Sequence, residues 1–441
     1  MSNQPKYNIG VYGATGFTGE RIVLYLAKLQ CTDQYSGPIL IGGRSESRLT
    51  AVIDHVISQL GRYNISKIKI DAIGGISVDK SAALDQFTSQ CNICISAAGP
   101  YRFLGPPVVQ SCINTKTNYI DVTGEPEFIE KMIVTYDDQA RDANISVVHA
   151  CGFDSIPSDM GSIYTQQQFK QQYGDNAVVS HIDTSFTVKT GNAGMAANTG
   201  TWESLVHGLS SSGTLQSIRK QLKQKYSDTQ PKRIGRASKP KMFYYDNKVH
   251  KWSLLFPGAD ASIVRNTQQQ LTKLGDNNVQ PYFAISFTVP SLFYAVLFAL
   301  FGTLLKLMVS FKLGKSLLLK YPSIFSLGMF KSSGPTQQQL NQTSFTMNYF
   351  ARGYKSIPSD TRSKPDLKLH TQLNAPEPGY VWTPIAAVES ALVLLNSIKS
   401  TRSVPPGVLT PGAAFKNTEL IERLNKVEGV QFRVLDAKIS R

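Results

Sequence analysis

Short apolar runs alternate with amphipathic stretches along the first 150 residues of the chain. Short apolar or alternating runs predict strands, whereas apolar residues at helical spacing predict helices. On this basis we expect strands at 7–12, 38–41, 67–71, 93–96, 118–122 and 146–150, and helices at 20–27, 51–60, 81–87, 107–112 and 127–141. Strands that alternate with helices in this way predict a doubly wound, Rossmann-like parallel sheet.

A glycine-rich turn, Gly13-Ala14-Thr15-Gly16-Phe17-Thr18-Gly19, joins the first predicted strand to the first predicted helix. Glycines let the backbone approach a ligand closely, and the first turn of a helix offers unpaired N–H groups to phosphates. The turn therefore predicts a dinucleotide site, although its G-x-x-G-x-x-G spacing departs from the usual G-x-G-x-x-G pattern. A plain tight turn between strand and helix is the alternative.

The end of the second predicted strand indicates which dinucleotide is bound. In a βαβ unit this strand end meets the adenosine ribose, where an acidic residue favours NAD. Here the chain carries Arg44 and Ser45, with Arg48 close behind. A guanidinium and a hydroxyl suit a 2′-phosphate, so the sequence favours NADP(H) over NAD(H). The alternative for Arg44 is a solvated arginine in a loop.

Two further strand ends are expected on the same rim, because ligands of such sheets bind beyond the carboxyl ends of the strands. Ala98, Gly99 and Pro100 are small residues beside which a flat cofactor can lie. Tyr101 and Asp154 are the candidate catalytic residues, acting as proton donors or as polar positioning groups. In the alternative interpretation Tyr101 stacks on the cofactor and Asp154 caps a helix.

Several separated blocks resemble the saccharopine dehydrogenase-like oxidoreductases, a family related to trans-acting enoyl reductases. The blocks are GATGFTG (13–19), GGRS (42–45), SAAGPYRFLGPPVVQSC (96–112), YIDVTGE (119–125), GFDSIPSD (152–159), TPIAAVESAL (383–392) and GVLTPGAAF (407–415). They are specific as a set and reach almost from end to end, with the weakest resemblance between about 178 and 374.

The resemblance implies a Rossmann domain for NAD(P), a second α+β domain for the substrate, and a C-terminal segment that returns to the first domain. We accordingly expect domains at 1–155, 156–380 and 381–441. The resemblance also implies a role for each cofactor residue. The pyrophosphate turn would comprise Gly13, Thr15, Gly16, Phe17 and Gly19; the adenosine ribose would meet Arg44 and Ser45; the nicotinamide half would lie beside Ala98, Gly99 and Pro100.

A long apolar segment interrupts the weakest part of the resemblance. Residues 277–305 carry no charged side chain, and 283–305 has the length that a membrane-spanning helix needs. Lysines interleaved with apolar residues follow up to about residue 330. The segment 283–330 predicts attachment to a membrane or lipid-droplet surface through 283–320, as a monotopic or hairpin insertion. A buried helix or dimer element and a true spanning helix are the alternatives.

Composition narrows the choice of partners. A chain of 441 residues with 41% hydrophobic residues is long enough for more than one folded domain. The net charge of +15 fits either a nucleic acid or an anionic membrane, and the apolar segment favours the membrane. The histidines and cysteines lack metal-ligand spacing, so we expect no metal; Cys91 and Cys94 fit a buried strand better than a redox pair.

The sequence therefore predicts an NADP(H)-dependent oxidoreductase that acts on a lipid-type carbonyl or enoyl group. We expect it at a membrane or lipid droplet, facing the cytosol, with no nucleic-acid partner. A homodimer is compatible with the sequence. The alternatives are a non-catalytic nucleotide-binding scaffold on a lipid surface and a soluble enzyme of amino-acid metabolism.

Overall fold

The computed structural model describes residues 5–237, 241–360, 363–400 and 402–439. These residues form two compact units, and the chain passes between them more than once. The first unit holds residues up to Phe153, together with Gly379–Leu409 and Asn417–Leu420. The second holds Asp154–Pro378, Thr410–Lys416 and the residues after Leu420. The predicted third segment, 381–441, is thus shared between the two units and does not return to the first as a whole.

The first unit is built on a parallel sheet of seven strands in the order β15-β6-β5-β4-β1-β2-β3. The strands are β1 (Tyr7–Tyr12), β2 (Ile39–Gly42), β3 (Ile70–Ile73), β4 (Cys91–Ser96), β5 (Asn118–Asp121), β6 (Ser146–Val148) and β15 (Gly407–Leu409). Six of them match the expected strands, with β3 displaced toward the C-terminus. β15 extends the edge beside β6, because Gly407–Leu409 pairs in parallel with Ser146–Val148.

Helices cover both faces of this sheet, as the alternating pattern predicts. They are α1 (Phe17–Cys31), α2 (Glu46–Gln59), the short η1 (Ile65–Lys67), α3 (Ser81–Thr88), α4 (Tyr101–Thr115), α5 (Pro126–Asp142) and α14 (Thr383–Lys399). α14 packs against α1, and α4 packs against α3 and α5. The expected helix at 107–112 is wrong in its start, since α4 already begins at Tyr101.

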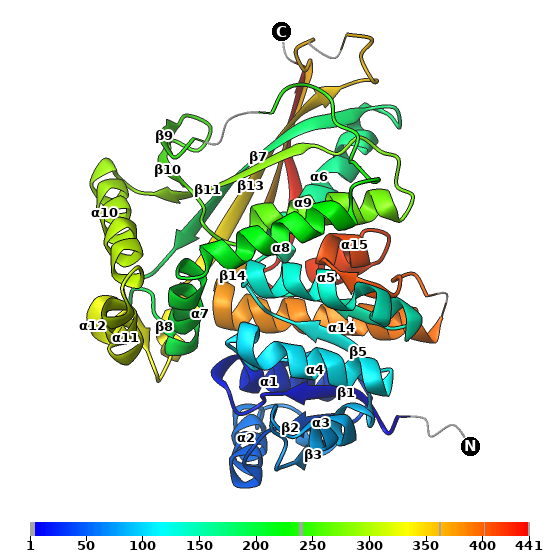
Figure 1. Ribbon diagram of the computed structural model, residues 1–441, viewed down its shortest axis with the longest axis vertical. Helices are drawn as coiled ribbons and strands as arrows, with labels where there is room; N and C mark the ends of the chain where they lie inside the picture. Colours follow the sequence, from blue (N-terminus) through cyan, green and yellow to red (C-terminus); the bar gives the residue numbers. More distant parts are fainter. Residues whose placement is uncertain (1–4, 238–240, 361–362, 401, 440–441) are drawn as a thin grey trace. The chain divides into compact units, whose positions relative to one another are not determined.

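The second unit contains a mixed sheet of seven strands in the order β16-β14-β13-β7-β11-β10-β9 (Figure 1). The strands are β7 (Val178–Lys189), β9 (Phe243–Asp246), β10 (Lys251–Leu255), β11 (Tyr282–Val289), β13 (Ser344–Tyr354), β14 (Leu367–Pro376) and β16 (Gln431–Ile439). β7 pairs in parallel with β11, and the other pairs are antiparallel. The expected α+β architecture of this part of the chain is confirmed.

Helices and two short strands complete the second unit. They are α6 (Ile156–Tyr173), β8 (Ala197–Asn198), α7 (Thr199–Leu209), α8 (Ser212–Lys225), α9 (Asp260–Lys273), α10 (Leu292–Val309), α11 (Lys312–Lys320), α12 (Pro322–Phe325), β12 (Phe330–Lys331), α13 (Gln337–Gln342), α15 (Pro411–Phe415) and α16 (Leu420–Asn425). Helix α6 packs on one face of the sheet, where the Tyr349 hydroxyl donates a hydrogen bond to the Pro157 carbonyl at 2.6 Å.

The apolar segment 283–305 is not one continuous helix, which corrects the sequence-based expectation. Its first part forms β11, whose residues 282–287 pair with β7 in the interior of the sheet. The helix begins only at Leu292, because Pro290 and Ser291 separate it from the strand. The membrane-length stretch is therefore divided into a sheet strand and an 18-residue helix, α10.

Helix α10 is mostly exposed, whereas its inner face packs on its neighbours. Only 17% of its 18-residue window is buried within the protein. Leu305 and Val309 join Trp202 of α7 and Leu318 of α11 in one apolar cluster. The Trp202 indole donates to the Leu318 carbonyl at 2.8 Å, so the position of α11 relative to α7 is fixed. An ordinary buried helix, one of the sequence-based alternatives, is thereby excluded for α10.

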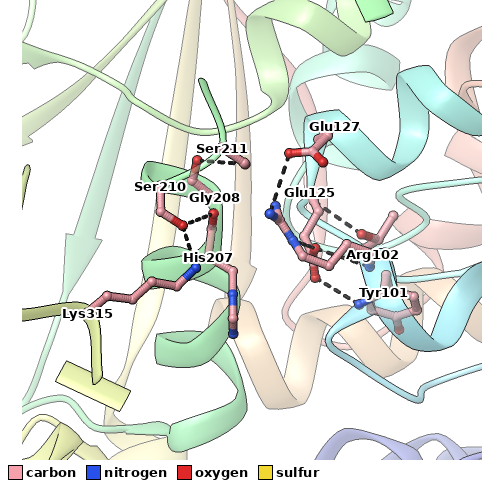
Figure 2. Close-up of polar contacts among 10 residues, drawn as sticks. Tyr101, Arg102, Glu125, Glu127, His207, Gly208, Ser210, Ser211 and Lys315 are labelled. Carbon is pink, nitrogen blue, oxygen red and sulfur yellow. Dashed lines mark hydrogen bonds and ion pairs between the residues drawn. The ribbon is translucent and has the colours of Figure 1, made fainter. Parts of the chain in front are cut away.

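A polar contact at the end of α7 also holds α11 in place (Figure 2). The Lys315 ammonium donates to the Ser210 hydroxyl at 2.9 Å, and that hydroxyl donates to the His207 carbonyl at 2.9 Å. A cation at the C-terminal end of a helix is favourable because the last carbonyls carry partial negative charge. Lys315 therefore supports the α7–α11 contact rather than standing free on the surface.

Candidate functional site

The turn between β1 and α1 has the backbone geometry of a phosphate cradle. Gly13 adopts a φ of +79°, and a Cβ at this position would lie 2.9 Å from the Ala98 backbone nitrogen. A Cβ on Gly19 would collide with the Gly13 carbonyl oxygen and lie 2.9 Å from Ala14 Cα. Both glycines are therefore required by the backbone itself. The Gly13 carbonyl accepts a hydrogen bond from the Gly16 N–H at 3.0 Å, which closes the turn.

The N-terminus of α1 carries no side-chain cap among the described residues. Gly16 is the N-cap residue, with an extended backbone (φ −81°, ψ 158°). The N–H groups of the first turn lack partners within a helix, and without a capping side chain they are available to an anion. Thr15 and Phe17 are partly exposed and Gly16 is exposed, so the end of the helix is accessible. These features fit the pyrophosphate of a dinucleotide.

Phe17 is positioned by aromatic contacts. Its ring meets the Tyr380 ring edge-on at a centroid distance of 4.8 Å, and the Arg21 guanidinium lies 4.9 Å from its centroid. These contacts fix the start of α1. Phe17 therefore packs beside the turn, and it is also one of the residues predicted to contact the cofactor.

Arg44 follows β2 directly and is exposed. No hydrogen bond or ion pair of its guanidinium occurs within the described residues, whereas its carbonyl accepts a hydrogen bond from the Gly75 N–H at 3.3 Å. Ser45 is the N-cap of α2 and accepts from the Arg48 N–H at 3.4 Å. Arg44 is thus a free cation beside a helix N-terminus, an arrangement that suits a phosphate group.

The loop after β4 lies against the glycine turn. The Ala97 N–H donates to the Tyr12 carbonyl at 2.9 Å, and Ala98 is the neighbour that leaves no room for a side chain at Gly13. Gly99 is exposed and Pro100 is partly exposed. The structure therefore brings the predicted residues 98–100 next to the predicted pyrophosphate turn, as residues lining one cofactor site should be.

Tyr101 does not lie free on the rim, contrary to the expected proton-donor role. It is the first residue of α4 and is buried, and its hydroxyl donates to the Ser96 carbonyl at 3.0 Å. Burial raises the pKa of this hydroxyl well above its ordinary value, and the nearby Asp121 raises it further. A phenol with its hydrogen bonded inward and its pKa raised is a structural group rather than a proton donor.

Glu125 explains why α4 begins where it does (Figure 2). Its carboxylate accepts from the Tyr101 N–H at 2.9 Å and from the Arg102 N–H at 3.3 Å, so it caps the first turn of the helix. Arg102 Nε donates to the same carboxylate at 2.8 Å, and Arg102 also reaches Glu127. The sequence analysis did not identify the Arg102–Glu125 pair. The available signals were an arginine after β4 and an acid after the neighbouring strand β5.

A second buried carboxylate joins the ends of β5 and β6. Asp121 accepts from the Tyr119 hydroxyl at 3.0 Å and from the Ala150 N–H at 2.9 Å. Its Oδ2 also lies 2.7 Å from His149 Nδ1, and both side chains are fully buried. These contacts fix the rim of the sheet from inside and leave the carboxylate no direct access to a ligand.

Asp154 opens the second unit and belongs to a group of three acids. It is partly exposed, whereas Asp159 and Asp260 are buried. Burial raises the pKa of Asp154 to about 6, that of Asp159 to about 6 and that of Asp260 to about 7, the last also through the charge of Asp154. Asp154 can therefore hold a proton near neutral pH, which an ordinary surface aspartate does not.

The other two acids of this group have structural partners. Asp159 Oδ2 accepts from the Thr267 hydroxyl and from the Gly412 N–H, each at 2.7 Å. Ser158 donates to Asp260 at 2.5 Å. Asp159 thus ties α6 to α9 and α15. Within the described residues no group of three or more histidine, cysteine, aspartate or glutamate side chains has metal-binding geometry.

Comparison with known proteins gives a consistent set of relatives. Residues 9–148 match the saccharopine dehydrogenase NADP binding domain. The chain is 35% identical over 443 residues to a mouse protein named saccharopine dehydrogenase-like oxidoreductase, with 99% of each chain covered. It is 31% identical over 456 residues to a probable mitochondrial saccharopine dehydrogenase-like oxidoreductase of Arabidopsis thaliana, covering 98% of this chain and 97% of the relative.

A third relative and one solved structure extend the comparison. The Caenorhabditis elegans protein is named lipid droplet localized protein and is 32% identical over 434 residues, covering 95% of this chain and 96% of the relative. The apo structure of saccharopine dehydrogenase (L-Glu forming) from Saccharomyces cerevisiae aligns with a TM-score of 0.56 at 12% identity, over 98% of this chain and 100% of that one. At that identity the structure supports the fold alone.

Proposed function

This chain belongs to the family of saccharopine dehydrogenase-like oxidoreductases, and we propose that it uses NADP(H) on a carbonyl or enoyl group of a lipid-type substrate at a membrane or lipid-droplet surface. The family's NADP binding domain covers the glycine turn, Arg44 and the loop at 98–100. The single observation that carries the proposal is the exposed apolar helix α10 in the same chain as this cofactor domain.

The exposed residues of α10 support attachment to a lipid surface. Phe293, Leu300 and Leu307 are 70%, 64% and 58% exposed. Several large apolar side chains exposed on one helix differ from the scattered single ones that are normal on a protein surface. Leu313 and Ile324, on the following helices, are 73% and 68% exposed. A contiguous apolar surface followed by lysines is typical of a helix that lies in a membrane interface.

The topology around α10 supports monotopic insertion over a spanning helix. β11 precedes α10 and β13 follows it, and both pair with β7 in one sheet. A single crossing would place these two strands on opposite sides of a bilayer. The following helix, α11, has nine residues and is about 14 Å long, too short to cross back. Helices α10 and α11 (292–320), without the strand β11 at 283–289, are thus proposed to lie in one leaflet or in the monolayer of a lipid droplet.

In the proposed reaction the bound cofactor supplies or accepts the hydride. The N–H groups at the α1 N-terminus would hold the pyrophosphate and the Arg44 guanidinium would hold the 2′-phosphate, which would orient the cofactor for hydride transfer. Asp154 is the proposed proton donor, because its carboxyl keeps a proton up to about pH 6. We do not propose Tyr101 for this role, since its hydroxyl is engaged by Ser96.

Arg44→Gln is expected to weaken NADPH binding about 10- to 100-fold, the worth of a charge-assisted hydrogen bond to a phosphate, while NADH binding changes by less than about twofold. Fluorescence titration with each nucleotide measures both affinities. Arg62→Gln, at an exposed arginine of the same unit, is the matched control and is expected to change neither. An equal loss for both nucleotides would assign Arg44 a role in folding instead.

Turnover tests the chemistry. The full chain, supplied with vesicles that contain keto or enoyl lipids, is expected to consume NADPH, with a rate that falls about tenfold per pH unit above pH 6 as Asp154 ionises. Asp154→Asn is expected to lower turnover at least about 100-fold and to leave NADPH affinity unchanged. Asp175→Asn, at an exposed acid of the same unit, is the control. Unchanged turnover in Asp154→Asn would remove this residue from the mechanism.

One observation supports the alternative of a non-catalytic, nucleotide-binding scaffold. The carboxylates of Glu125 and Asp121, and the hydroxyl of Tyr101, are all engaged within the first unit. A Rossmann unit whose rim acids are occupied in this way can bind a nucleotide without catalysing hydride transfer. NADPH binding without turnover on any lipid of the panel would favour that alternative.

A further inference from the structure

A shallow basic groove crosses the face of the second-unit sheet opposite α6. It has a volume of about 770 Å³ and is lined by β7, β13, β14, β16 and the hairpin of β9 and β10. Its cationic side chains are Lys189, Lys248, Lys251 and Arg433, with His370 between them. No aspartate or glutamate of the described chain is among the lining residues. The lining residues therefore carry positive charge only, while Asp183, which pairs with Lys248, and Asp436, which acts on His370, lie beside them.

The floor of the groove is a connected layer of amides. Asn348 Oδ1 accepts from His370 Nε2 at 3.0 Å and from Gln372 Nε2 at 2.9 Å. Gln372 Oε1 in turn accepts from Asn374 Nδ2 at 2.8 Å and from Arg433 Nη2 at 2.7 Å. Apart from the Asn374–Gln372 bond within β14, these bonds join neighbouring strands, so the floor is polar and its geometry is fixed before any ligand arrives.

Two of the lysines have no anionic partner. Lys248 is paired with Asp183, whose carboxylate lies 3.1 Å from the ammonium. Lys189 and Lys251, in contrast, form no ion pair or hydrogen bond through their ammonium groups anywhere in the described chain. Burial lowers the pKa of Lys251, and the charge of Lys189 lowers it further, so the two cations lie within electrostatic range of each other. Two like charges beside an acid-free floor are relieved when an anion binds between them.

Lysine ammonium groups together with amide and hydroxyl donors match the donor set that a phosphate accepts. A second copy of the chain fits less well, because a two-fold contact would bring this basic face against itself and set cation against cation. The groove thus favours a phosphorylated ligand.

The hairpin of β9 and β10 links the groove to the apolar surface. Leu254 of β10 packs with Ala295 of α10 on the face of the sheet opposite the groove, because it lies three residues beyond Lys251. Lys251 nevertheless lies at the end of β11 that leads into α10, since the next residue, Trp252, pairs with Val289. Phe243 and Tyr245, on the paired strand β9, are 43% and 45% exposed. A lipid surface that receives α10 would therefore lie near the strand end that carries Lys251.

We propose that this basic groove binds the phosphate headgroup of an anionic phospholipid, an inference that rests on the proposed attachment of α10 to a lipid surface. Lys189 and Lys251 contact the phosphate, and the amide floor donates to the headgroup. The apolar helix supplies affinity for any lipid surface, and the groove selects surfaces that carry phosphomonoester headgroups.

The test is binding of the full chain to vesicles of phosphatidylcholine alone and of phosphatidylcholine with phosphatidic acid, measured by flotation. Lys189→Gln combined with Lys251→Gln is expected to weaken binding to the phosphatidic acid vesicles about 10- to 30-fold, because each lysine near an anionic surface contributes about fivefold. Binding to neutral vesicles is expected to stay unchanged. Lys131→Gln combined with Lys223→Gln, at two exposed lysines outside the groove, removes the same charge and is the matched control.

The outcomes separate this proposal from the proposed function. Equal losses of vesicle binding in the groove variant and the control would overturn the proposed phosphate site, because they would reflect net charge alone. Unchanged binding of the groove variant to both vesicles would also overturn it, while neutral-vesicle binding would still stand as evidence for α10. Calorimetry with glycerol 3-phosphate tests whether the ligand is instead a soluble phosphate ester. Tight binding of this ester, without any preference for phosphatidic acid vesicles, would overturn the lipid assignment.

Discussion

Gly16→Asp is expected to reduce NADPH binding at least about 100-fold while the protein stays folded. Gly16 is the N-cap of α1 and has the extended backbone that an aspartate N-cap adopts. The new carboxylate would accept from the first-turn N–H groups that the pyrophosphate needs, and its charge would repel the phosphates. The thermal midpoint is expected to change little, because the better N-cap, worth a few tenths of a kcal/mol, is offset by the new Cβ, which would lie 3.3 Å from the Gly13 carbonyl oxygen.

Gly16→Asn is the matched control for this substitution. Asparagine caps a helix about as well as aspartate but carries no charge. It is expected to weaken NADPH binding less than Gly16→Asp does, and the ratio of the two affinities measures the electrostatic part. Calorimetric titration with NADPH and thermal unfolding of both variants give the comparison. If Gly16→Asp bound NADPH as tightly as the unaltered chain, the assignment of the pyrophosphate to this turn would be wrong.

Replacement of Phe293, Leu300 and Leu307 by glutamine together is expected to abolish flotation with neutral vesicles. Each of these side chains is more than half exposed on α10. An apolar side chain of this size gains about 1.5–3 kcal/mol on leaving water, so the three together account for several kcal/mol of surface affinity. Their exposure in the folded chain means that the change should leave folding and NADPH binding intact.

The control for α10 carries glutamine at three other exposed apolar positions, Ile65, Leu274 and Ile357, which are 42%, 40% and 49% exposed. This variant is expected to float as the unaltered chain does. Flotation that survives in the α10 variant would contradict lipid attachment through this helix, and would favour the soluble enzyme that the sequence leaves open. A change in sedimentation of the α10 variant would instead assign the helix to contacts between copies.

The geometry of the glycine turn was predictable because most of its interactions are local. Gly13 and Gly19 are required by contacts with the turn itself and, for Gly13, with Ala98 in the loop after β4. The strand, the turn and the helix follow each other directly in the chain, so their pattern reveals the geometry. The position of Arg44 after β2 was predictable for the same reason, since it follows from the βαβ order.

The role of Tyr101 could not be read from its place in the chain. Its N–H is bound by Glu125, which lies 24 residues further along. The start of α4 therefore depends on a carboxylate that only the folded sheet brings near. The division of 283–305 into β11 and a helix has a similar origin, because a short apolar run does not by itself distinguish a buried strand from a helix. Only the pairing of β11 with β7 and β10 decides it.

By itself the sequence determined the strand–turn–helix start of the chain and the NADP binding domain, and it showed two stretches apolar enough for a membrane helix. Tertiary structure decided which of those residues are covered. The stretches 378–399 and 292–309 both have the length and mean hydropathy of a membrane helix, yet 83% of the first window is buried and only 17% of the second. Hydropathy belongs to the residues, whereas burial depends on what packs around them: the first sequence is enclosed beside α1 and the sheet, and the second is left with one open side.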